Sequence, residues 1–171
     1  MTDQTPSTPL IGAIDHIGLT VPDLDAAVDF YTKALGGREL FRLGPFDSRE
    51  LSEEGQDWTA EHVAVPDALY SVAMVGFADG PLIEFLEYVR PEGSQVAPRN
   101  NDLGGHHIAF EVMDLDAALA QLVANGGSAQ AGPIVVPAGE DATGSWEAFT
   151  VNYVQDPWGN QLELVYYPGR H

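Results

Sequence analysis

Residues 105–118 read GHHIAFEVMDLDAA, and residues 14–27 read IDHIGLTVPDLDAA. With an offset of 91 positions, the two stretches share a histidine, an isoleucine and a valine, and then the whole run Asp-Leu-Asp-Ala-Ala. A repeat of this size within one chain indicates two similar structural units. Both units begin with a histidine, so the histidine belongs to the repeated pattern.

Each unit starts with the alternating pattern of a strand and continues with the spacing of a helix. In the first unit, Ile17, Leu19 and Val21 share one face of the predicted strand, and His16 lies on the other. In the second unit, the apolar residues of the strand likewise oppose His107. Aspartates occupy the helix N-cap positions and glycines follow each helix, namely Asp23 and Asp114, Gly36-Gly37 and Gly126-Gly127.

Strand-like runs follow each predicted helix, and the last run of each unit carries a glutamate. GPLIEFLEY, residues 80–88, aligns with GNQLELVYY, residues 159–167, which places Glu84 over Glu163. Each half therefore reads as a strand, a helix and three further strands. The first half is longer between its histidine and its glutamate, and we expect the extra residues in the polar stretch 44–62, where they would form a lid.

The composition sets limits on partners and on location. Seven Lys and Arg residues face 26 Asp and Glu residues, a formal net charge of −19, which disfavours nucleic acid and anionic membrane surfaces as partners. The basic residues are scattered, so a substrate with several phosphates is also disfavoured. Cysteine is absent and no apolar run is long enough to span a membrane, so we expect a cytoplasmic protein.

The repeat also predicts the domain organisation. Residues 1–11 are expected to form a flexible tail, because they are polar and lack a signal-peptide pattern. We predict a first βαβββ module over residues 12–90, a linker over 91–104 and a second βαβββ module over 105–171.

Four residues at equivalent positions of the two units suggest a metal site. If the first and last strands of each half are neighbours, His16 approaches Glu84, and His107 approaches Glu163. Two imidazoles and two carboxylates suit one divalent cation such as Zn, Ni, Co, Mn or Fe, with positions left for substrate. His106 lies on the apolar face and is interpreted as a structural residue or as a neighbour of the ligands.

These motifs give the chain a resemblance to the vicinal oxygen chelate superfamily, the glyoxalase, bleomycin-resistance and dioxygenase fold. The resemblance implies an α+β fold in which two βαβββ modules form a curved mixed sheet around a metal. It implies that the ligands are His16, Glu84, His107 and Glu163, and that the substrate is a small molecule. It also implies a homodimer, with the site either within one chain or between two.

Several reactions remain open for such a site. We predict an epimerase or isomerase that moves a proton α to a carbonyl, with Glu84 and Glu163 as catalytic residues and a small, weakly charged oxygenated substrate. The alternatives are a glyoxalase I-like lactoylglutathione lyase, an Fe(II) ring-cleaving dioxygenase and a non-catalytic drug-binding module. Candidate pocket residues are Phe46, Trp58, Trp146, Phe149 and Tyr153, and the dioxygenase alternative would also involve His62.

Overall fold

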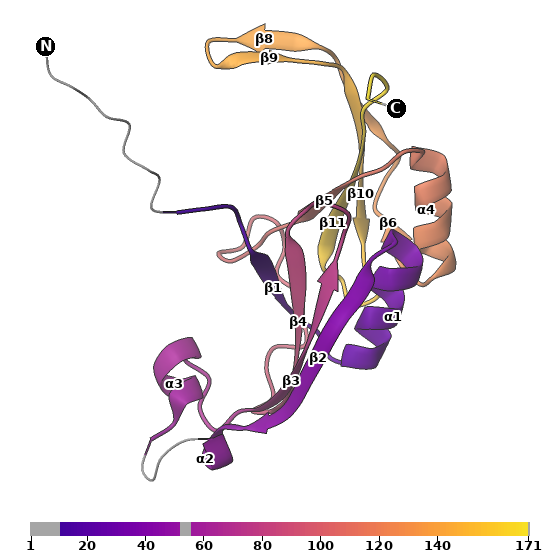
Figure 1. Cartoon of the computed structure of the whole chain (residues 1–171). Helices are drawn as coiled ribbons and strands as arrows, with labels where there is room; N and C mark the ends of the chain where they lie inside the picture. The colour runs from indigo at the N-terminus through magenta and orange to yellow at the C-terminus, as the bar shows by residue number, and fades with distance from the viewer. Residues whose placement is uncertain (1–10, 52–55, 171) are drawn as a thin grey trace, which may run out of the picture.

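The structure is a computed structural model, which describes residues 11–51 and 56–170 (Figure 1). The tail predicted over residues 1–11 therefore lies outside the described residues, apart from Ile11. The segment predicted as a lid, 44–62, is described except for residues 52–55.

The first half of the chain forms a four-stranded sheet with one long helix on it. Its strands have the spatial order β1-β4-β3-β2, with β1 parallel to β4 and the other pairs antiparallel. Two short helices connect β2 to β3. The elements are β1 (His16–Thr20), α1 (Leu24–Leu35), β2 (Arg38–Asp47), α2 (Ser48–Leu51), α3 (Trp58–Val63), β3 (Leu69–Gly76) and β4 (Leu82–Arg90).

The second half repeats this arrangement with shorter strands. Its sheet has the order β5-β11-β10-β6, β7 also pairs with β10, and β5 is parallel to β11 as β1 is to β4. A separate hairpin, β8–β9, extends beyond this sheet (Figure 1). The elements are β5 (Ile108–Glu111), α4 (Leu115–Ala124), β6 (Ser128–Ala129), β7 (Ile134–Val136), β8 (Gly139–Asp141), β9 (Gly144–Trp146), β10 (Phe149–Gln155) and β11 (Gln161–Tyr166).

The predicted fold class is confirmed. The first half follows the βαβββ order with two short helices inserted, and in the second half the short strands β6 and β7 share one edge of β10 and the hairpin β8–β9 is inserted before it. The chain is a mixed α+β structure with curved, unclosed sheets. The register is also repeated, because Gly18 pairs with Glu84 and Ala109 pairs with Glu163. In both modules the glutamate of the last strand thus lies beside the residue two positions after the histidine.

The helix boundaries follow from capping. The side chains of Asp23 and Asp114 accept hydrogen bonds from the amides of Ala26 and Ala117, as the repeated aspartates predict. Helix α1 ends at Gly36, which has a left-handed φ of 70° and donates its amide to the carbonyl of Tyr31. A residue with a Cβ would be strained at this position.

One core joins the two modules. Helices α1 and α4 contact each other and lie on the same side of the molecule (Figure 1). Their apolar side chains pack with the helix-facing residues of both sheets, including Phe85 and Leu164, which are fully buried. The Tyr31 hydroxyl of α1 donates a hydrogen bond to buried Asp156 in the turn between β10 and β11, at 3.1 Å.

The extra residues of the first half lie in the segment 44–62 as predicted, where α2 and most of α3 are found, but the strand before them is longer than the sequence indicated. Residues 44–47 belong to strand β2, which continues past an irregularity in its pairing so that Phe46 lies opposite Tyr70. The sequence did not show that β2 extends to Asp47, because this strand lies at the sheet edge, where most of its residues are exposed and give no clear alternation. The hairpin β8–β9 was likewise not predicted from the sequence. In the part of the chain that the structure describes, no helix is long and apolar enough to cross a membrane.

Candidate metal and active site

The two sheets each have one face that α1 and α4 do not cover, which we call the open face. On β4 the side chains alternate: Ile83 and Phe85 are buried in the core, and Glu87 accepts a hydrogen bond from the amide of Leu24 in α1. Glu84 therefore belongs to the open face, together with Leu86 and Tyr88.

His16 and Glu84 form the first pair on the open face. Strands β1 and β4 are parallel neighbours, and this brings Nε2 of His16 to 3.7 Å from a carboxylate oxygen of Glu84. The side chains are 41% and 28% exposed, so both ligand atoms are reachable from solvent.

His107 and Glu163 form the equivalent pair of the second module. Nε2 of His107 lies 3.2 Å from a carboxylate oxygen of Glu163. The Glu163 side chain is only 12% exposed, whereas that of His107 is 41% exposed. The ring of Tyr153 packs edge-on against His107, with ring centroids 5.6 Å apart, and restricts the imidazole on one side.

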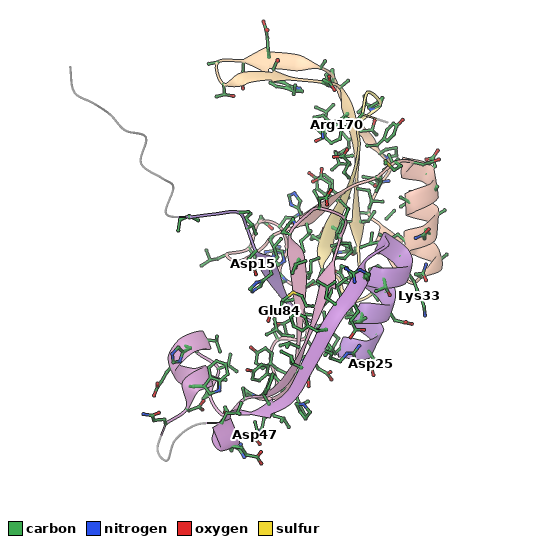
Figure 2. The ribbon with its side chains drawn as sticks, viewed as in Figure 1. Asp15, Asp25, Lys33, Asp47, Glu84 and Arg170 are labelled. Atoms are coloured by element: carbon green, nitrogen blue, oxygen red, sulfur yellow. The ribbon has the colours of Figure 1, made fainter. Side chains whose placement is uncertain are left out.

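The first pair has an additional acidic neighbour, Asp15, which precedes His16 in the sequence. The second pair has no such neighbour, because His106 precedes His107. The carboxylate of Asp15 lies 2.8 Å from Nδ1 of His16, and Figure 2 shows Asp15 and Glu84 in the same region, away from Lys33 on α1. This hydrogen bond, together with the negative charge of Glu84, raises the pKa of His16 despite partial desolvation. His106 occupies the equivalent position in the second module, where its Nδ1 lies 3.2 Å from the carbonyl of Gly104.

The geometry of each pair fits a shared cation. Two atoms bound at about 2.1 Å to one ion lie at most about 4.2 Å apart, and both N···O distances are within this limit. A carboxylate that holds Nδ1 of a ligating histidine, as Asp15 does, is a common feature of metal sites. Among residues 11–51 and 56–170, however, no three histidine, aspartate or glutamate side chains lie together as a metal-binding group. The structure thus brings the four predicted ligands together as two pairs.

Aromatic residues line the open face beyond Glu84. Four of them contact one another: the ring of Tyr70 lies 5.5 Å from Phe46, 6.2 Å from Trp58 and 5.5 Å from Tyr88, measured between centroids. We call Phe46, Trp58, Tyr70 and Tyr88 the aromatic wall. Trp58 comes from α3, so the inserted helix closes one end of this surface.

The other predicted pocket residues are more dispersed. Phe149 packs against Tyr167 at the far end of β10, and Trp146 lies in the hairpin β8–β9 with its indole N–H donated to the carbonyl of Pro137. His62 is exposed, and its Nδ1 lies 2.9 Å from the carbonyl of Trp58.

Sequence reasoning missed Tyr70 and Tyr88. A signal for Tyr88 was present, because it stands four positions after Glu84 in the run LIEFLEY and so shares its face of the strand. Tyr70 could be found only from the pairing of β3 with β4, which sets it opposite Tyr88.

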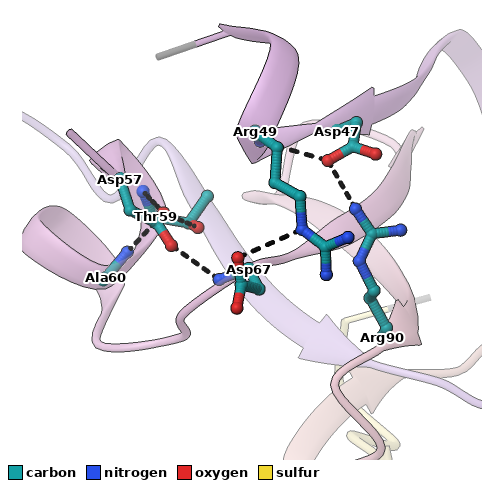
Figure 3. Close-up of polar contacts among 7 residues, drawn as sticks. All are labelled: Asp47, Arg49, Asp57, Thr59, Ala60, Asp67 and Arg90. Carbon is teal, nitrogen blue, oxygen red and sulfur yellow. Dashed lines mark hydrogen bonds and ion pairs between the residues drawn. The ribbon is translucent and has the colours of Figure 1, made fainter. Parts of the chain in front are cut away.

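The basic residues offer little free positive charge. Six of the seven Lys and Arg residues pair with carboxylates, among them Arg49 with Asp67 at 3.1 Å and Arg90 with Asp47, close to the inserted helices (Figure 3). The other four pairs are Lys33 with Asp29, Arg42 with Asp25 and Glu39, Arg99 with Asp102, and Arg170 with Glu111.

A profile of the Glyoxalase/Bleomycin resistance protein/Dioxygenase superfamily matches residues 13–164. The chain belongs to this superfamily. The resemblance inferred from the repeat is thereby confirmed. Members of the superfamily commonly use a divalent metal ion, act on small molecules and often form dimers.

A curated relative narrows the reaction class. The chain is 35% identical over 159 residues to a 2-epi-5-epi-valiolone epimerase from Actinomyces sp., covering 91% of this chain and 80% of the relative. The prediction of an enzyme in the epimerase or isomerase class is confirmed by this relative.

Solved structures agree on the fold. A glyoxalase family protein from Bacillus cereus superimposes with a TM-score of 0.68 over 95% of this chain and 97% of its own, at 20% identity. A glyoxalase I variant from Zea mays superimposes with a TM-score of 0.53 at 21% identity, covering 89% of this chain and 43% of its own.

Proposed function

We propose that this protein is a divalent-metal-dependent epimerase that acts at a carbon next to the carbonyl of a small polyhydroxylated ketone. The observation that carries the proposal is the pair of His–Glu contacts, His16 with Glu84 and His107 with Glu163, at equivalent positions of two modules. The similarity to a 2-epi-5-epi-valiolone epimerase supports the reaction and suggests that compound, or a close analogue, as substrate.

The metal would be held by His16, Glu84, His107 and Glu163. When bound, a divalent cation supplies Lewis acidity, which stabilises the negative charge that develops on a carbonyl oxygen when the neighbouring carbon loses its proton. Nε2 is the nitrogen of each histidine that faces the carboxylate of its pair, and Asp15 holds Nδ1 of His16 on the opposite side. Asp15 therefore keeps the ligating nitrogen of His16 directed toward Glu84.

Glu84 and Glu163 would move the proton. One carboxylate removes the α proton from one face of the substrate, so that the carbon becomes planar. The other carboxylate, protonated beforehand, returns a proton to the opposite face and so inverts the configuration. This requires the two glutamates to face the carbon from opposite sides and within hydrogen-bond reach of it.

Two copies of the chain would complete the site. Each described pair supplies one nitrogen and one oxygen ligand, whereas catalytic metal sites typically have three or more protein ligands. We propose a homodimer in which the His16–Glu84 pair of one protomer faces the His107–Glu163 pair of the other. Exposed apolar side chains on the open face, such as Phe41 and Leu43 of β2, support a partner surface or a substrate there.

The charge distribution favours a neutral substrate. A phosphate, a coenzyme A ester or a glutathione adduct would need free basic anchors, and Arg49 and Arg90 near the aromatic wall are already paired with aspartates. This argues against the lactoylglutathione lyase alternative.

Solvent-deuterium exchange tests the proposed function. The purified protein, loaded in turn with Zn, Ni, Co, Mn or Fe, is incubated with 2-epi-5-epi-valiolone in D2O. We expect one deuterium to enter at the carbon that is inverted, and we expect a chelator to abolish the exchange. Consumption of O2 without exchange of the α proton would instead establish a dioxygenase and end the proposal.

A further inference from the structure

The aromatic wall and Glu84 share one face of one sheet. On β4, Glu84 and Tyr88 are four residues apart, which separates their Cα atoms by about 13 Å. On β3, Tyr70 is the cross-strand partner of Tyr88, and Met74 is that of Glu84. The tyrosines and the glutamate thus mark the two ends of a single surface.

The pKa values of the phenol groups of Tyr70 and Tyr88 are both raised. Partial burial raises the pKa of Tyr70 and of Tyr88, and the negative charge of Glu84 raises both further. A phenol with a raised pKa stays protonated near neutral pH and remains a hydrogen-bond donor.

The Tyr88 side chain is half-buried, whereas that of Tyr70 is buried, with 8% of the residue exposed. The rings of Tyr70 and Tyr88 stack from paired positions of β3 and β4, with centroids 5.5 Å apart and an interplanar angle of 26°. Among the described residues neither hydroxyl has a hydrogen-bond partner, and neither is one of the buried unpaired polar atoms. Paired hydroxyl groups that border an apolar surface suit a ligand that carries hydroxyls on a hydrocarbon ring.

Helix α3 is fixed in place against this surface. Asp57 caps the helix by accepting hydrogen bonds from the amides of Thr59 and Ala60, and it also accepts one from the amide of Asp67 at 2.6 Å (Figure 3). The Asp67 carboxylate in turn pairs with Arg49 of α2. Trp58, the first residue of α3, is therefore held against Tyr70 before any ligand binds.

We infer that Tyr70 and Tyr88 determine specificity by hydrogen-bonding the hydroxyl groups of a neutral polyhydroxylated ring, which rests on the aromatic wall with its reacting carbon near Glu84. The inference rests on the proposed function for the identity of the reacting carbon. The binding of the polyhydroxylated ligand ring depends only on the aromatic wall. The charges of Arg49 and Arg90 near the wall are compensated by Asp67 and Asp47, which favours a neutral ligand there.

Two measurements on the metal-loaded full-length protein test the inference. The first is calorimetric binding of the polyol obtained by reducing the carbonyl of 2-epi-5-epi-valiolone, which cannot lose an α proton. The second is deuterium exchange with hydroxyacetone, a small ketone that cannot reach the wall. The variants are Tyr70→Phe, Tyr88→Phe and the double variant. Tyr166→Phe is the matched control, because Tyr166 lies near the start of α4 on the other side of its sheet.

We expect the double variant to bind the polyol on the order of tenfold more weakly than the wild type, because it lacks two hydrogen-bonding hydroxyls. Its exchange rate with hydroxyacetone should stay within about twofold of the wild type, as should both measurements on Tyr166→Phe. Unchanged polyol binding in the double variant, or no polyol binding by the wild type, would overturn the inference. Weakened polyol binding in a protein that exchanges no α proton would support the wall as a ring-binding surface and reject the proposed function.

Discussion

At the scale of single residues, Glu163 is the strongest candidate for a proton-transfer group. Its carboxylate is largely shielded and lies 3.2 Å from His107, so replacement by the isosteric glutamine removes the base and leaves the packing nearly unchanged. We expect Glu163→Gln to lower kcat by about 10²–10⁴-fold, measured by deuterium exchange. Glu140→Gln, in the hairpin β8–β9, serves as the control. Full activity of Glu163→Gln with a normal circular dichroism spectrum would remove this residue from the mechanism.

Asp15 offers a second residue-scale test. Asparagine at this position keeps the size of the side chain but removes the charge next to Nδ1 of His16. We expect Asp15→Asn to weaken metal binding by about 10- to 100-fold, measured by competition with a chelator. We also expect a lower pKa for His16 in the metal-free protein, followed by NMR of the imidazole. An unchanged metal affinity would limit Asp15 to a surface contact.

The pH dependence at His16 has a definite sign. The pKa of His16 is raised in the folded protein above its ordinary value of 6.5, mainly by Asp15. In the metal-free protein its contribution to stability is therefore complete below pH 6.5 and is lost as the pH rises through the raised pKa. Asp15→Asn should remove most of this dependence in urea unfolding measured across that pH range.

The positions of His16 and His107 were predictable because alternation assigns each residue of a strand to a face. The role of Asp15 was not, since alternation places neighbouring residues on opposite faces. Asp15 precedes the first residue of β1, so its backbone is not bound by that rule and its carboxylate can reach the ring of the next residue.

At the scale of elements, the inserted helix α3 depends on one aspartate. Hydrogen bonds from the amide of Asp67, from Thr59 and from the amide of Ala60 lower the pKa of Asp57 to about 2. We expect Asp57→Ala to fray α3 and to increase hydrogen exchange at the amide of Ala60 by on the order of tenfold. Trp58 fluorescence should shift as its ring leaves Tyr70. Asp79→Ala, in the turn before β4, is the control.

The same cap predicts an acid dependence. Because the pKa of Asp57 is lower in the fold than its ordinary value of 3.8, its stabilising effect is present above that value and is lost as the pH falls toward 2. Protection of the α3 amides should therefore decrease over that interval in the wild type and should vary little in Asp57→Ala.

Elements with a buried face were predictable, and elements without one were not. Helix α1 follows from the recurrence of Leu24, Val28 and Tyr31, all of which are buried. Strand β2 lies at a sheet edge with most residues exposed, and β8 and β9 have three residues each and no core contact. The position of β2 depends on its pairing with β3, about 30 residues further along the chain, which a local pattern does not contain, and the hairpin β8–β9 is too short to show an alternation.

At the scale of the whole molecule, Tyr31 and Asp156 connect the two modules inside the core. Burial and the charge of Asp156 raise the pKa of Tyr31, so the phenol remains a donor. We expect Tyr31→Phe to lower the free energy of unfolding by about 1–3 kcal/mol, because a buried carboxylate loses one donor. Asp156 keeps its bonds to Trp158 and Asn160, so its turn should persist. Urea unfolding measures the loss, and a change within experimental error would show that these remaining bonds suffice.

The arrangement of modules also decides how the site is completed, and mixed dimers test it. One variant carries His16→Ala and Glu84→Gln, and the other carries His107→Ala and Glu163→Gln. If each site combines pairs from two protomers, a mixed dimer contains one site with all four ligands and one with none. Either variant alone should be inactive, and an equimolar mixture refolded together should regain about a quarter of wild-type activity per chain, because half of the dimers are mixed. If both pairs of a site come from one chain, every site in the mixture is defective and no activity returns.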